Sequence, residues 1–130
     1  MMTITTAPDE WTIRLGLVVL THEGGEKGRR YPGGVITLRS DLGPIARRCT
    51  LMHEIGHVIH DDEPGTPAWR DARQEKRADE WAVTQLVSCE DYATAENLVG
   101  SSEGALAREL GITTHLLRVW RGLHERRTAA

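Results

Sequence analysis

The apolar residues in the first third of the chain predict two strands. Between residues 11 and 20, apolar side chains at positions 11, 13, 15, 17 and 19 alternate with Thr12, Arg14 and Gly16, which is the period of a half-buried strand. A second, shorter strand is predicted at residues 35–39. Residues 23–34 contain five glycines and a proline, so we expect a long connection between the two strands.

The pattern after residue 43 predicts helices. Pro44 can occupy a first helical position, because proline's fixed φ and missing donor are harmless there. This helix should extend to about residue 60 and form the centre of the core, since its apolar residues cover most of its circumference. A second long helix is expected to about residue 88, with Thr66 as its N-cap and Pro67 at its start. Further helices are expected at residues 91–99 and on either side of residues 111–113.

These elements predict an α+β fold in a single domain. The 130 residues are enough to bury one hydrophobic core but too few for two. We expect a small antiparallel sheet of two or three strands packed on helices. About residues 103–127, with two amphipathic segments around Gly111, are expected to form a helix-turn-helix-like C-terminal part.

Composition and charge narrow the function classes. The net charge of −3 argues against broad attraction to nucleic acid or to an anionic membrane. The longest apolar run, residues 15–20, is far shorter than the roughly 20 residues of a membrane helix, and the start of the chain lacks a signal pattern. We therefore expect a cytoplasmic protein. The two cysteines, Cys49 and Cys89, are not in a CxxC pair, so neither a disulfide framework nor a four-cysteine metal site is predicted. Both are expected to be reduced, small core residues.

Residues 53–57 read HEIGH, which is the HExxH pattern of zinc peptidases. On a helix, His53 and His57 lie on one face, so both imidazoles can bind one ion. Glu54 lies about 100 degrees around the helix from His53, where it can act as a general base on a water at the metal. Burying these polar residues in an apolar helix without partners would be unfavourable, and a metal would satisfy the imidazoles.

A third ligand is expected from the next helix. Glu75 follows a sharp turn after the first helix, so two antiparallel helices can bring it to the histidines. Glu80 or an aspartate of the Asp61-Asp62 pair are the alternatives. Asp79, one helical turn after Glu75, faces the same side and can accept the free N–H of a histidine ligand. Three protein ligands leave one zinc position open, which favours a catalytic over a structural ion.

Two motifs in this order resemble the ImmA/IrrE family of bacterial and phage metallopeptidases: MHEIGH at residues 52–57 and EKRADEWA at residues 75–82. The family's second motif reads ExxAxxFA, so Trp81 stands where phenylalanine is usual. The resemblance also includes VITL at 35–38 and LARELGIT at 106–113. It implies a gluzincin-like peptidase that binds Zn²⁺ and cleaves a protein partner, such as a helix-turn-helix transcriptional repressor of a phage or mobile element.

Two questions stay open at this level. An oxyanion-stabilising donor is expected beside the zinc, and the spacing does not choose between Tyr92 and His115. The rival function is a non-catalytic module that binds DNA or a repressor through the last two helices, with phosphate contacts from four arginines: Arg118, Arg121, Arg126 and Arg127. Against it, residues 101–130 carry five arginines and three glutamates, a weak positive excess.

Overall fold

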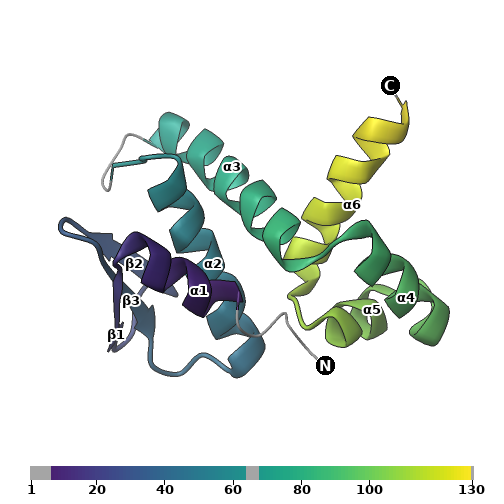
Figure 1. Ribbon diagram of the computed structural model, residues 1–130, viewed down its shortest axis with the longest axis horizontal. Helices are drawn as coiled ribbons and strands as arrows, with labels where there is room; N and C mark the ends of the chain where they lie inside the picture. Colours follow the sequence, from purple (N-terminus) through teal and green to yellow (C-terminus); the bar gives the residue numbers. More distant parts are fainter. Residues whose placement is uncertain (1–6, 64–67, 130) are drawn as a thin grey trace.

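A computed structural model describes residues 7–63 and 68–129 of the chain. Three strands, β1 (Val18–His22), β2 (Gly28–Tyr31) and β3 (Val35–Arg39), form one sheet. The helices are α1 (Ala7–Leu15), α2 (Pro44–Ile59), α3 (Ala68–Leu86), α4 (Cys89–Val99), α5 (Glu103–Leu110) and α6 (Thr114–Ala129). The sheet and α1 form one end of the molecule and α4, α5 and α6 the other, with α2 and α3 between them (Figure 1). The α+β class predicted from the sequence is confirmed.

The sheet is mixed, whereas an antiparallel sheet was expected. β3 lies between the other two strands, parallel to β1 and antiparallel to β2. The chain leaves β1 at one edge, crosses to the opposite edge as β2, and returns between them as β3. The glycine-rich stretch expected to be a plain connection therefore contains a strand, β2, and this strand reverses the direction that a simple hairpin would have given.

The predicted strand at residues 11–20 is wrong in its first half. Residues up to Leu15 form α1, Gly16 adopts a positive φ of 66°, and β1 begins at Val18. Trp11 and Leu15 are four residues apart and both pack on the core, as one helical face requires. Ile13 would share their face in a strand, but it is 81% exposed.

α2 is the centre of the core, as its apolar pattern predicted. Its buried Met52 and Ile55 pack with Ile36 and Leu38 of β3 on the sheet side, and the core continues through Val83 of α3 and Leu117 of α6. The predicted start at Pro44 agrees with the structure, and the helix ends at Ile59. The predicted N-cap and first residue of the next helix, Thr66 and Pro67, lie outside the described residues.

α2 and α3 approach each other closely at Gly56. A Cβ atom there would lie 3.1 Å from the Ala78 carbonyl oxygen and 3.2 Å from the Ala78 Cα. The absence of a side chain thus lets the two backbones pack at a distance that places the next turns of both helices side by side. The HExxH motif of α2 and Glu75 of α3 lie on these turns.

The C-terminal helices are fixed to this pair by polar contacts. Arg48 of α2 donates a hydrogen bond to the carbonyl oxygen of Gly111, which ends α5 in the left-handed conformation. Thr113 Oγ1 accepts from the Leu116 amide at 3.2 Å and so caps the start of α6. The first turn of α6 therefore lies beside α2.

Candidate metal centre

The structure brings His53, His57 and Glu75 together. His53 and His57 lie one turn apart on α2, and Glu75 reaches them from α3. The two imidazole Nε2 atoms are 3.1 Å apart, Glu75 Oε2 lies 2.5 Å from His53 Nε2, and Glu75 Oε1 lies 3.0 Å from His57 Nε2. Glu80 and the two aspartates after α2 are not part of this group of donor atoms.

The donor set fits a divalent metal ion. Donor atoms about 2.05 Å from a tetrahedral ion lie roughly 3.3 Å from one another, close to the spacing of these three side chains. Two imidazole nitrogens and one carboxylate are also the ligand types of catalytic zinc sites. Both histidines direct Nε2 towards the same point, because each Nδ1 is bound to a carboxylate behind it.

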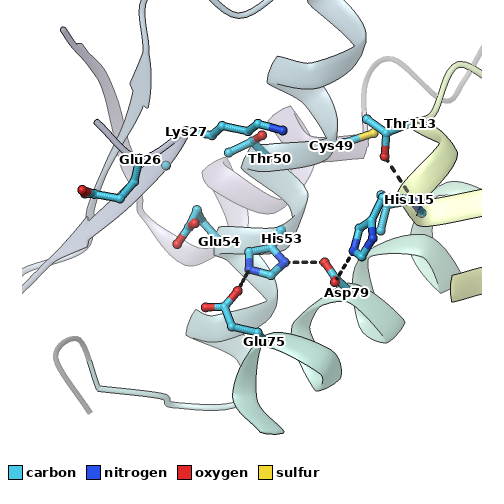
Figure 2. A pocket seen from close by; sticks show the side chains of 12 residues that line it. Glu26, Lys27, Cys49, Thr50, His53, Glu54, Glu75, Asp79, Thr113 and His115 are labelled. Carbon is cyan, nitrogen blue, oxygen red and sulfur yellow. Dashed lines mark hydrogen bonds and ion pairs between the residues drawn. The ribbon is translucent and has the colours of Figure 1, made fainter. Parts of the chain in front are cut away.

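Asp79 holds His53 in this orientation. Its Oδ1 lies 2.7 Å from His53 Nδ1, the contact expected from its place one turn after Glu75. Its Oδ2 lies 2.7 Å from Nε2 of His115 in the first turn of α6 (Figure 2). The carboxylate therefore connects a candidate ligand to the C-terminal helices.

Asp62 has the same role for His57, which the sequence reasoning missed. It was weighed as a possible metal ligand, but it lies behind the ring, with Oδ2 3.0 Å from His57 Nδ1 and its side chain almost fully buried. Arg77 donates to its other oxygen at 2.5 Å, and Arg30 donates to its carbonyl oxygen at 2.5 Å. The sequence signal was a carboxylate in the turn directly after a buried motif histidine.

Glu54, the predicted general base, is buried beside the ligand group. Burial raises the pKa of its carboxyl, because the charged form loses water. Its Oε1 lies 3.4 Å from Nε of Arg30 on β2. β2 comes this near because Gly28 has no side chain: a Cβ there would lie 2.9 Å from Glu54 Cγ and 2.8 Å from Thr50 Cγ2.

The cluster is strongly coupled electrostatically. Burial lowers the pKa of His53, but the hydrogen bonds to Asp79 and Glu75 outweigh it and raise the pKa to about 10. The hydrogen bonds from His53 and His57 keep the pKa of the Glu75 carboxyl far below its usual range. Glu75 is therefore a carboxylate at neutral pH, which favours a cation at this position.

A pocket of about 450 Å³ opens onto the centre. Its walls come from the start of β2, from α2 one turn before His53, and from the first residues of α6 (Figure 2). His115 lines this pocket. Tyr92, the other candidate for an oxyanion donor, instead stacks on Trp120 with ring centroids 4.2 Å apart.

The arginines proposed for phosphate contacts are partly engaged elsewhere. Arg118 makes a bidentate pair with Glu103, with both distances 2.9 Å. Arg121 donates to the Ser101 carbonyl oxygen and to the Tyr92 hydroxyl. The side chains of Arg126 and Arg127 lie outside the part of the chain that is described.

Comparisons with known proteins bear on the family and the fold of this chain. The Peptidase M78 family model, described as the IrrE N-terminal-like domain, matches residues 14–119. A search of curated proteins finds no significant sequence match. Among solved structures, a Mycobacterium tuberculosis transcriptional regulator is similar in fold, with a TM-score of 0.70 and 16% identity over 89% of this chain. The aligned region spans 40% of that regulator. Within the described residues, no helix has the length and apolar character needed to cross a membrane.

Proposed function

Because the chain belongs to the Peptidase M78 family of IrrE N-terminal-like domains, we propose that it is a zinc-dependent endopeptidase acting on a protein partner in the cytoplasm. The observation that supports this most directly is the position of Glu54. It is a buried carboxylate next in sequence to His53, on the wall of the pocket that contains the three candidate ligands. A structural ion would not need a base at this position.

In this proposal His53, His57 and Glu75 hold the ion, while Asp79 and Asp62 fix the tautomer of the two histidines. Bound zinc would supply a Lewis acid that polarises a carbonyl and acidifies water. Glu54 takes the proton from the attacking water and passes it to the leaving amine. Its raised pKa suits both steps, because a carboxyl with a pKa nearer neutrality accepts and returns a proton more readily.

His115 is the better of the two candidates for the oxyanion donor. Its ring lines the pocket, and Asp79 accepts a hydrogen bond from Nε2, which fixes the orientation of the ring. Tyr92 donates no group to this pocket. His115 would then donate to the developing charge on the scissile carbonyl.

The substrate would bind as an extended segment along β2. This strand is at an edge of the sheet, and its first residue lines the pocket beside Glu54. A peptide can add to such an edge through main-chain hydrogen bonds. A helix-turn-helix repressor as the natural substrate is the finer part of the proposal, and it is supported only by the resemblance to repressor-cleaving members.

The test compares wild type with Glu54→Gln. Zinc per chain is measured by native mass spectrometry, and cleavage is measured on a peptide library and on candidate repressors. Glu54→Gln should keep one zinc and lose cleavage by a factor of about 100 or more, because the base is removed while the ligands remain. A wild type that binds no added zinc, or a variant that still cleaves at the wild-type rate, would reject the proposal.

A further inference from the structure

Charges in the pocket are paired, with one exception. Four carboxylates line it, and each contacts an arginine or histidine side chain: Glu26 contacts Arg29, Glu54 contacts Arg30, Glu75 contacts the two motif histidines, and Asp79 contacts His53 and His115. The side-chain ammonium of Lys27, at the mouth, has no hydrogen bond or ion pair to any residue that the structure describes. The uncompensated charge in this pocket is therefore positive.

The position of Lys27 directs this charge to one end of the pocket. Its side chain extends from the segment before β2 across the opening, towards Thr50 and Cys49 on α2, whereas Glu26 points away (Figure 2). Thr50 and Cys49 precede His53 by three and four residues, so this end lies about one helical turn, roughly 5 Å, from the metal ligands. A side chain next to the scissile bond has the length to reach it.

The walls at this end suit an acidic side chain. Cys49 is 5% exposed and Leu116 is 3% exposed, and both present apolar atoms that can pack on methylene groups. Thr50 offers a hydroxyl and Lys27 an ammonium, both of which donate to a carboxylate. A basic side chain would instead bring a second positive charge against Lys27.

We propose that Lys27 makes this pocket selective for substrates with glutamate or aspartate next to the scissile bond. This inference rests on the proposed peptidase function, because only a peptidase has a scissile bond. The preference of the pocket for an acidic side chain can nevertheless be measured without hydrolysis. Lys27 is a specificity-determining residue in this proposal, and it takes no part in the chemical steps. The preference should weaken with added salt, because the pair is open to solvent.

The experiment uses zinc-loaded protein and three peptide hydroxamates that differ only in the side chain beside the zinc-binding group: glutamate, glutamine or lysine. Dissociation constants are measured by competition against a fluorescent hydroxamate. Wild type should bind the glutamate probe about two- to fivefold more tightly than the glutamine probe, as expected for one solvent-exposed ion pair. Lys27→Glu should reverse the order and bind the lysine probe more tightly than the glutamate probe.

Lys76→Glu is the matched control, because Lys76 is exposed on α3 and does not line the pocket. It should keep the wild-type order of the three probes. Equal binding of the glutamate and glutamine probes to wild type, or an unchanged order in Lys27→Glu, would overturn the selectivity. An acidic preference in binding without cleavage of any peptide would support the selective pocket and reject the peptidase. Cleavage without an acidic preference would support the peptidase and reject the selective pocket.

Discussion

Replacing Gly56 by alanine adds one methyl group, and we expect it to reduce metal affinity more than the stability of the fold. In Gly56→Ala the new Cβ would lie 3.1–3.2 Å from the Ala78 backbone and 3.2 Å from Trp81 Cε3. Alanine is favoured over glycine in a helix by about 1 kcal/mol. Overpacking a tight contact costs about 1–3 kcal/mol, and here the neighbour is mostly backbone, which relaxes only if a helix moves. The free energy of unfolding should therefore fall by about 0–2 kcal/mol.

Metal affinity should fall more clearly than stability. Glu75 lies three residues before Ala78 on α3, while both histidines lie on α2, so any separation of the helices moves one ligand away from the other two. Changes that disturb the support of metal ligands typically reduce affinity about 10–100-fold. We expect a loss of at least about tenfold in Gly56→Ala.

Urea unfolding in excess chelator measures stability without the contribution of bound metal, and chelator competition measures zinc affinity. Gly104→Ala in α5 is the control, because its nearest contact is the end of the Arg108 side chain at 3.7 Å. This control should leave zinc affinity unchanged and keep or slightly raise stability. Gly56→Ala with wild-type zinc affinity and higher stability would refute the reasoning that the helix crossing is tight at this residue.

Three further predictions use other contacts. Gly28→Ala should retain zinc but lose cleavage about tenfold or more, because its Cβ would displace Glu54, 2.9 Å away; wild-type activity would contradict this. Asp62→Asn should weaken zinc binding about 10–100-fold by chelator competition, and an unchanged affinity would show that this carboxylate does not orient its histidine. Cys89 is exposed, so the expectation that both cysteines are core residues is wrong for it, while Cys49 is buried. Iodoacetamide at pH 8 should therefore modify Cys89 and spare Cys49 by mass spectrometry, because burial raises the pKa of the Cys49 thiol and keeps its reactive thiolate scarce; equal rates would reject this.

The parts of the site that depend on helical periodicity could be predicted from the sequence. The spacing of His53 and His57, and of Glu75 and Asp79, places each pair on one helical face. The structure puts all four side chains in one cluster. Their roles as ligands and support remain predictions that metal binding must test.

The parts that depend on long-range packing could not be predicted. Arg30 meets the Asp62 carbonyl across 32 residues, and His115 meets Asp79 across 36. No local pattern encodes such contacts. The strand wrongly predicted over α1 has a different cause. Apolar residues at 11, 13 and 15 fit the period of a strand, but Trp11 and Leu15 also fit one face of a helix. The exposure of Ile13 in the structure shows that the helical pair is the one that packs on the core.

Two glycines explain why α2 can be both the core helix and the site helix. At Gly28 the strand β2 approaches α2 closely, and at Gly56 α3 does so, and an added Cβ would be crowded at both positions. The first approach brings Arg30 to Glu54, and the second brings Glu75 to the histidines. Gly56 is one of the two unspecified positions in the HExxH pattern, yet in this chain the candidate third ligand, Glu75, lies beside the two histidines because the helices pack closely at this glycine. The motif predicts two ligands and a base by its own geometry, whereas the third ligand depends on how closely the next helix can pack.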